Sequence, residues 1–328
     1  MPGGAEAWRL ADGRLHLLHG PIDLIVEAFG DPAAVEQAYR RAEAGFQGLL
    51  DGLVAEIEVL KTPLASAPAA LPPAVEGVVA RRMVRAAWPW RKLYVTPMAA
   101  VAGAIADEVL EAINRADEVL EEINRADEVL EAINRVDEVL EAAAGSERGA
   151  GASREGALER VYVNNRGDIA FHLEAGQSFS TGVIPDPRSP ERQTRILLPG
   201  HSPVRGLATS GWRGRSWSLG IADAVAAFAP RAAEADVAAT LIANAVNVEH
   251  PAVERRPAGE VFEDGDLGDL PVTVTVGELP PEAVAAALDA GNAVAEQALR
   301  EGLITGALLF LAGSVRAVGF VGETPESA

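Results

Sequence analysis

A tandem ten-residue repeat is the feature that most limits what this chain can fold into. Residues 106–115 read Ala-Asp-Glu-Val-Leu-Glu-Ala-Ile-Asn-Arg, and nearly the same letters recur at 116–125, 126–135 and, in part, 136–145. Ala, Leu and Glu favour a helix. Ten residues turn a helix by about 1,000°, roughly 80° short of three full turns, so the apolar stripe rotates from copy to copy. One copy can therefore pack against a core, whereas later copies cannot keep the same face toward it.

The role of the repeat stays open between two interpretations. Residues 107–141 carry thirteen acidic residues and three arginines, half of the net charge of −20. They are either an acidic arm that binds a partner or a duplicated insert that the fold tolerates. An unbroken helix over 98–143 would be roughly 70 Å long, and a helical hairpin turning at Asn-Arg is the alternative. We expect an extension at 106–145 and a flexible linker at 146–157, both inside one domain spanning 10–322.

Composition excludes several classes of protein. The 328 residues include no cysteine, which rules out disulfides, thiolate metal sites and cysteine nucleophiles. The net charge of −20 argues against a nucleic-acid partner, because phosphate binding needs Lys and Arg. No apolar run approaches the ~20 residues of a membrane span. The N-terminus shows no export signal. We therefore expect a cytoplasmic protein with a small-molecule partner and no membrane.

The pattern along the chain predicts an α+β protein with antiparallel or mixed sheets and long helices packed against them. Asp31 and Pro32 begin a helix that runs to about residue 60, with a break between 45 and 52. A second helix is expected at 75–88 and a third at 280–302. Short alternating runs predict strands at 14–18, 22–26, 161–164, 169–173, 193–198, 271–276, 304–311 and 314–321.

Residues 206–248 carry the best candidate for a binding site. They predict a strand, a Gly-rich turn, a second strand and, after Pro230, an Ala-rich helix. Asp236 and Thr240 are four residues apart on that helix and face the same way. A carboxylate and a hydroxyl one turn apart can hold a hard cation through oxygen. The alternative is that the helix is simply packed, since Asp and Thr at this spacing also occur by chance.

Four segments together resemble the ApbE-like superfamily, the FAD:protein FMN transferases, and most closely an uncharacterised branch of it. The paired signature is Ala-Thr-Ser-Gly at 208–211 with Ala-Asp-Val-Ala-Ala-Thr at 235–240. Residues 164–169 (Asn-Asn-Arg-Gly-Asp-Ile) are similar to the superfamily's Gly-Gly-Asp-Ile strand end. Residues 96–106 resemble its small-residue helix start. The resemblance implies an ApbE-like fold with two similar halves.

The resemblance also implies the site. Mg²⁺ would be held by Asp236, Thr240 and a backbone carbonyl near Ala102, where it meets the diphosphate of FAD. The remaining cofactor-binding residues would come from the other matching segments; they are Thr96, Gly167, Asp168, Thr209, Ser210 and Gly211. The implied activity attaches FMN to a protein hydroxyl.

The chain also departs from the transferase pattern. Gly103 stands where the superfamily has Lys, Arg166 replaces the first Gly of Gly-Gly-Asp, and the His-x-x-Asp-Pro-x-x-Gly motif after Gly211 is missing. Three functions therefore stay open. They are a Mg²⁺-dependent flavin-transferase-like enzyme, a flavin- or nucleotide-binding protein that lost the transferase motifs, and a structural adaptor acting through the acidic repeat.

Three further features each have two interpretations. His201 is the candidate general base, or an incidental loop residue. Arg81, Arg82 and Arg85 form a basic cluster that is either a solvated helix face or a contact for ligand phosphate. Two tryptophans, Trp212 and Trp217, could stack on an aromatic ligand or simply pack.

Overall fold

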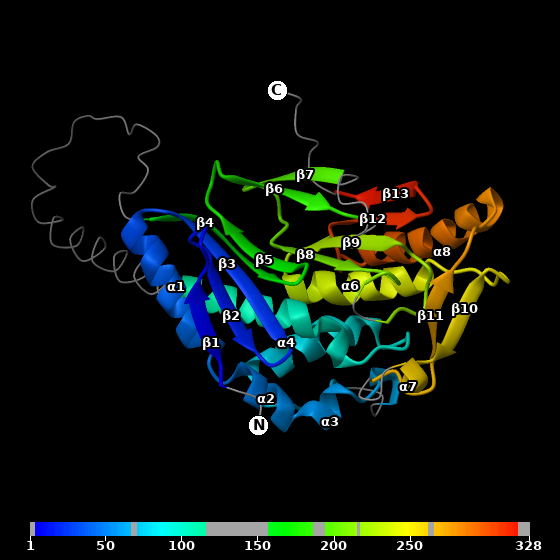
Figure 1. The fold of residues 1–328 in the computed structure, drawn as a ribbon, viewed down its shortest axis with the longest axis horizontal. Coiled ribbons are helices and arrows are strands. Elements are labelled where there is room, and N and C mark those ends of the chain that lie inside the picture. The colour runs from blue at the N-terminus through cyan, green and yellow to red at the C-terminus, as the bar shows by residue number, and fades with distance from the viewer. Residues whose placement is uncertain are drawn as a thin grey trace, which may run out of the picture.

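A nine-stranded antiparallel sheet forms the centre of the protein (Figure 1). The computed structural model describes residues 4–66, 71–115, 157–185, 194–214, 217–261 and 266–320. The strand order is β1-β2-β3-β4-β5-β8-β9-β12-β13. Its strands are β1 (Glu6–Arg9), β2 (Leu15–His19), β3 (Ile22–Gly30), β4 (Leu158–Asn165), β5 (Asp168–Leu173), β8 (Gly206–Ser210), β9 (Ala224–Ala229), β12 (Gly306–Leu311) and β13 (Ser314–Gly319).

Every strand pairing in the described residues is antiparallel, so the α+β class with antiparallel sheets and packed helices is confirmed. The large sheet contains two groups of four strands; one is β2, β3, β4 and β5, and the other is β8, β9, β12 and β13. In each group two antiparallel strand pairs flank a helical segment, which lies between β3 and β4 or between β9 and β12. The resemblance also implies that an ApbE-like fold is built from two similar halves. That implication stays a prediction.

Helices cover one face of the sheet. Helix α1 packs on β3, α6 on β8 and β9, and α8 on β12 and β13. Beneath α6 lie α4 and the helical residues 101–115. The helices are α1 (Pro32–Phe46), α2 (Leu49–Ala55), α3 (Ile57–Leu60), α4 (Val78–Ala87), α6 (Ala232–Ala245), α7 (Ala258–Val261) and α8 (Pro281–Arg300), with 3-10 turns η1 (Leu64–Ser66), η2 (Trp88–Trp90) and η3 (Pro97–Ala100).

The predicted start of the first helix is confirmed in atomic detail. The Asp31 carboxylate accepts hydrogen bonds from the backbone amides of Ala33 and Ala34, at 2.9 and 3.4 Å. Pro32 occupies the first helical position, where its missing N–H costs nothing. The predicted break between 45 and 52 is also present, because α1 ends at Phe46 and α2 begins after Gly48.

Two hydrophobic cores sandwich the sheet. The larger one lies between the sheet and the helices, and the smaller one lies between the opposite face and a two-stranded sheet of β6 (Ser178–Val183) and β7 (Thr194–Pro199). All six residues of β9 are buried because this strand is covered on both faces. Val225 and Ala227 point to the helices, whereas Ala226 and Phe228 point to β6 and β7. A second small sheet pairs β10 (Val253–Pro257) with β11 (Pro271–Val276).

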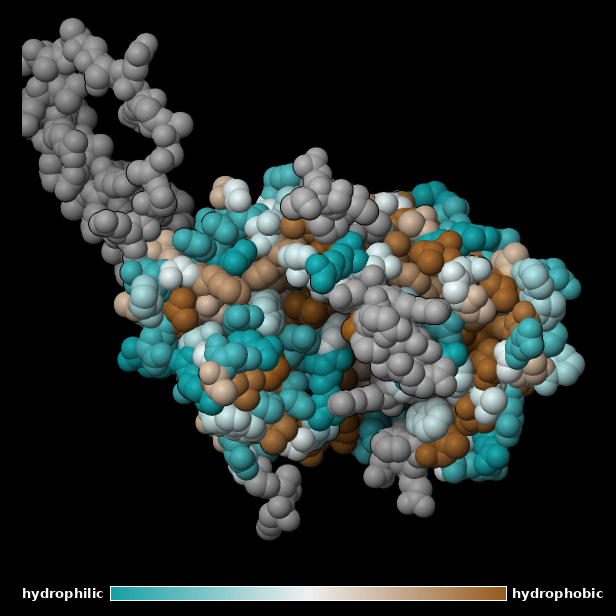
Figure 2. Space-filling model, turned by 45° about the horizontal axis from the view of Figure 1, so that its top comes forward, coloured by the Kyte–Doolittle hydropathy of each residue, from teal (hydrophilic) through white to brown (hydrophobic). Residues whose placement is uncertain are grey.

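The surface carries only scattered apolar groups where it is described. On the face shown in Figure 2, hydrophobic residues lie in small groups between hydrophilic ones. The exposed large hydrophobic side chains come from different elements, for example Trp8, Val59 and Val315. Within the described ranges, no helix has the length and apolar character needed to cross a membrane.

Most of the decapeptide repeat lies outside the described residues. The first copy, residues 106–115, is helical, and its Val109 and Ile113 are fully buried in the larger core. The copies from 116 onward and the predicted linker at 146–157 fall in the undescribed range 116–156, apart from residue 157.

Candidate functional site

The hairpin between β4 and β5 sets the position of one acidic side chain, Asp168. Its two-residue turn consists of Arg166 at φ 56° and Gly167 at φ 114°, and both values are in the left-handed region. The side-chain oxygen of Asn164 accepts a hydrogen bond from the Gly167 amide at 2.8 Å, which fixes the turn. Asp168 pairs with Asn165 across the hairpin, so both side chains lie on the same face of the sheet.

That face is the one covered by helices. Ala170, two residues after Asp168, belongs to the larger core beneath the helices, and strand side chains alternate between faces. Asn165 is buried and donates a hydrogen bond from its side-chain nitrogen to the Ala102 carbonyl oxygen at 3.1 Å. The start of the helix at 101–115 is therefore attached to the end of β4.

The same helix start crosses α6 at close range, with Gly103 at the contact. A Cβ at Gly103 would lie 2.3 Å from the Ala232 carbonyl oxygen, so only glycine fits here. The Gly103 amide donates to the Asp236 carboxylate at 2.9 Å. Gly103 thus permits the crossing and also orients Asp236.

Asp168 and Asp236 form an interacting pair of carboxylates. Burial raises the pKa of Asp168 to about 7. A hydrogen bond from the Thr209 amide favours the charged form and lowers this pKa, but by less than burial raises it. Burial also raises the pKa of Asp236 well above its usual value, and the nearby charge of Asp168 raises it further. Two carboxylates that repel each other in this way share a proton or neutralise their charge with a cation.

Strand β8 contributes differently from what the sequence suggested. Thr209 pairs with Ala226, so its side chain points to the β6–β7 side, and its amide is the group that reaches Asp168. Ser210 pairs with Val225 and points to the helix side. The hydroxyl on the helix side of β8 is therefore that of Ser210, not that of Thr209.

The structure does not bring all the predicted residues to this corner. Thr240 lies one turn after Asp236 on α6 and is half-buried. Thr96 is buried, and its hydroxyl is hydrogen-bonded to the Asp266 carboxylate. His201 lies in the exposed turn between β7 and β8. Gly211 packs against the chain before β9, because a Cβ there would lie 2.6 Å from the Asp223 carbonyl oxygen.

The available oxygen atoms suit a hard cation better than a transition metal. Within the described ranges, no three His, Cys, Asp or Glu side chains cluster as a metal site. The corner offers the Asp168 and Asp236 carboxylates. The Thr240 hydroxyl lies one turn further along α6, and the Ala102 carbonyl oxygen already accepts a hydrogen bond from Asn165. Two carboxylates supplemented by neutral oxygens match Mg²⁺, which keeps waters and phosphate oxygens in its shell.

Trp212 adds an aromatic ring directly after Gly211. Its indole nitrogen is buried and has no hydrogen-bond partner among the described residues. The guanidinium of Arg213 stacks on the ring with its carbon 4.5 Å from the centroid, and it pairs with Asp223 at 2.7 Å. An unpaired buried N–H costs about 1–3 kcal/mol, so this indole nitrogen is a donor without an acceptor among the described residues.

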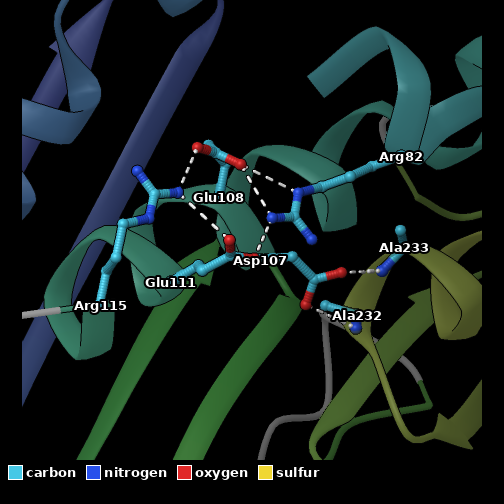
Figure 3. A network of polar contacts seen from close by, with 7 residues as sticks. All are labelled: Arg82, Asp107, Glu108, Glu111, Arg115, Ala232 and Ala233. Carbon is cyan, nitrogen blue, oxygen red and sulfur yellow. Dashed lines mark hydrogen bonds and ion pairs between the residues drawn. The ribbon is translucent and has the colours of Figure 1, made fainter. Parts of the chain in front are cut away.

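A polar network on the far side of the helix crossing holds α6 in place (Figure 3). The Asp107 carboxylate accepts hydrogen bonds from the amides of Ala232 and Ala233, at 2.9 Å each, and so caps the first turn of α6. Next to it, Glu108 pairs with Arg82 at 2.9 Å and with Arg115 at 3.4 Å. No local sequence signal predicts this cap, because all four repeat copies carry the same Asp-Glu pair at their second and third positions.

These features define an α+β protein with a carboxylate-pair corner between a central sheet and two crossing helices. The family model described as AbpE bacteria matches residues 7–133 and 137–317, and the chain belongs to this family. A UPF0280 protein of Methanopyrus kandleri is 32% identical over 194 residues, which cover 58% of each chain. A UPF0280 protein of Methanoculleus marisnigri is 34% identical over 124 residues, 36% of this chain and 49% of that protein. The chain thus spans about half the length of these relatives.

Proposed function

We propose that the protein binds a flavin nucleotide together with Mg²⁺ at the corner formed by Asp168, Asp236 and Thr240, with the metal ion at the diphosphate of FAD. The observation that carries the proposal is the carboxylate pair itself. Each of its members accepts a backbone hydrogen bond, from Thr209 and Gly103 respectively, although burial and repulsion disfavour the charged forms. A divalent cation would offset that repulsion.

The flavin part of the proposal depends on family likeness. The match to the AbpE family and the resemblance to the ApbE-like superfamily point to FAD or FMN as the ligand. A Mg²⁺ ion bound here would neutralise diphosphate charge and favour departure of AMP. The chain's own contributions are the Ser210 hydroxyl on the helix side of β8 and the indole N–H of Trp212, which has no partner among the described residues.

The structure favours binding over the complete transferase reaction. Gly103 has no side chain where the superfamily carries Lys, and the close contact with Ala232 leaves no space for one. His201 lies in the turn after β7, a strand that contributes to the smaller core rather than to the core beneath the helices. One observation supports catalysis: Asp168, with a pKa of about 7, could accept a proton near neutral pH. Transferase-like turnover is therefore the second candidate.

Titration of FAD fluorescence with and without Mg²⁺ tests the proposal. We expect wild-type protein to bind FAD at least 10-fold more tightly with Mg²⁺, and Asp236→Asn to lose this dependence. Asn keeps an oxygen for the Gly103 amide, so the fold is preserved. Glu234→Gln is the matched control, since it removes a carboxylate from the same helix away from the corner. Equal Mg²⁺ dependence in Asp236→Asn would refute the site, and AMP release measured by chromatography separates enzyme from binder.

A further inference from the structure

A cavity of about 640 Å³ lies between α4 and the start of α6, and neither Asp168 nor Asp236 lines it. This volume suits a drug-sized ligand. Its wall is largely apolar and includes Pro72, Val75, Val78, Val84 and Trp88. An apolar wall of this kind favours the hydrocarbon or aromatic part of a ligand.

Four arginines also line this cavity, namely Arg81, Arg82, Arg85 and Arg231. Arg82 is already paired with Glu108 and Glu111, as Figure 3 shows for Glu108. Across the part of the chain that the structure describes, the other three form no ion pair with a carboxylate. All three side chains are exposed, so their guanidinium groups are accessible to an incoming anion.

The two carboxylates in the cavity, those of Asp107 and Glu234, offset the charge of the four arginines only in part. Asp107 directs its oxygens to the amides of Ala232 and Ala233. Burial raises the pKa of Glu234, and the Asp107 charge raises it further, against the effect of Arg231 and Arg85. Because Asp107 occupies the free amides at the start of α6, an incoming anion would meet guanidinium groups rather than backbone N–H groups.

We propose that this cavity binds a small amphiphilic organic anion, with a phosphate or sulfonate group on Arg85 and Arg231 and an apolar body against Val75, Val78 and Trp88. Guanidinium forks match these tetrahedral anions in bidentate geometry. The site is separate from the Asp168–Asp236 corner and does not depend on the proposed flavin function.

Fluorescence titration with anilinonaphthalene sulfonate, an aromatic anion, tests the proposal. We expect saturable binding at one site, and at least 10-fold weaker binding to the double variant Arg85→Gln/Arg231→Gln. Uncharged phenylnaphthylamine should bind both proteins equally, because the apolar wall is unchanged. Arg85→Lys/Arg231→Lys should restore part of the affinity. Both arginines are exposed, so circular dichroism should show an intact fold in every variant.

Two controls separate this site from other surfaces. Arg40→Gln/Arg300→Gln removes two exposed arginines elsewhere and should leave sulfonate binding unchanged. Asp236→Asn should also leave it unchanged. Equal sulfonate affinity in wild type and Arg85→Gln/Arg231→Gln would overturn the proposal. Displacement of the sulfonate by FAD would show that this site is not separate from the proposed flavin site.

Discussion

The two sides of the helix crossing carry opposite charge although they share the first two turns of α6. On one side, Asp236 faces Asp168 and the Gly103 amide; on the other, Arg231 and Glu234 line a cavity rich in arginine. The first side suits a cation and the second an anion. A net charge of −20 therefore says little about any one site, because the arrangement of the helices sorts charge locally.

The crossing itself connects the two sides. Gly103 and Asp107 lie one turn apart on the helical residues 101–115. Gly103 donates its amide to α6 at Asp236, and Asp107 accepts the amides at the start of α6. Changes at these two positions should therefore disturb both sites, whereas changes within either site should disturb that site alone.

The largest effect is expected from Gly103→Ala. The added Cβ would lie 2.3 Å from the Ala232 carbonyl oxygen and would force the two helices apart. We expect the free energy of unfolding to fall by about 3 kcal/mol or more, measured by urea denaturation. Gly52→Ala is the control, because a Cβ there meets nothing within 4 Å and should stabilise α2 by about 0.5–1 kcal/mol. A neutral Gly103→Ala would show that the crossing is looser than described.

Removal of the α6 cap should follow in size. Asp107→Ala leaves the amides of Ala232 and Ala233 without their acceptor in a buried place, at a cost of about 2–3 kcal/mol. Asp31→Ala removes the exposed cap of α1 and should cost about 1 kcal/mol. Thermal unfolding of both variants gives the comparison. If the two variants lost equal stability, burial of the Asp107 cap would not increase its contribution to the free energy of unfolding.

A smaller, pH-dependent effect is expected from Asp168→Asn. The pKa of Asp168 is about 7 in the folded protein, above its ordinary 3.8, so the folded state binds more protons than the unfolded state between these values. Stability of metal-free wild type should therefore fall as pH rises through this window and level off above it. Asn cannot ionise, so the variant should gain stability relative to wild type as the pH rises from 4.5 to 8. Parallel denaturation curves at the two pH values would contradict the carboxylate repulsion.

The smallest effect is expected at the β4–β5 turn. Arg166 has φ 56°, a conformation that costs a side-chain-bearing residue about 1 kcal/mol and that glycine adopts freely. Arg166→Gly removes this cost but also loses the exposed ion pair with Asp23 at 3.1 Å. We expect a net gain of about 0.5 kcal/mol in the free energy of unfolding, measured by denaturant titration. A loss above 1 kcal/mol would mean that the ion pair matters more than the strain.

Much of the fold could be predicted from local patterns. Alternation with clear turn residues gave the hairpin around Gly20 and Pro21, and the Asp31-Pro32 pair gave the start of α1. Strands without apolar alternation were missed. β10 (Val253–Pro257) reads Val-Glu-Arg-Arg-Pro, is only half-buried at best, and takes its conformation from pairing with β11. β1 is exposed throughout and, among the described strands, pairs with β2 alone.

The site was harder to predict, because it depends on contacts between distant segments. Spacing placed Asp236 and Thr240 on one helix face, but only the strand order brings Asp168 next to Asp236. The direction of Thr209 follows from the register of β8 against β9, which a single strand does not reveal. The Asp107 cap depends on which repeat copy packs in the core. Because the copies are nearly identical, their sequences do not indicate which copy that is.

Binding of Mn²⁺ as a paramagnetic substitute for Mg²⁺ tests the central claim most directly. Electron paramagnetic resonance measures the concentration of free Mn²⁺ during a titration. It therefore distinguishes one tight site from weak binding to acidic residues elsewhere. We predict one tight site in wild type and in Glu234→Gln, and its loss in Asp236→Asn. An unchanged tight site in Asp236→Asn, or none in wild type, would contradict the account.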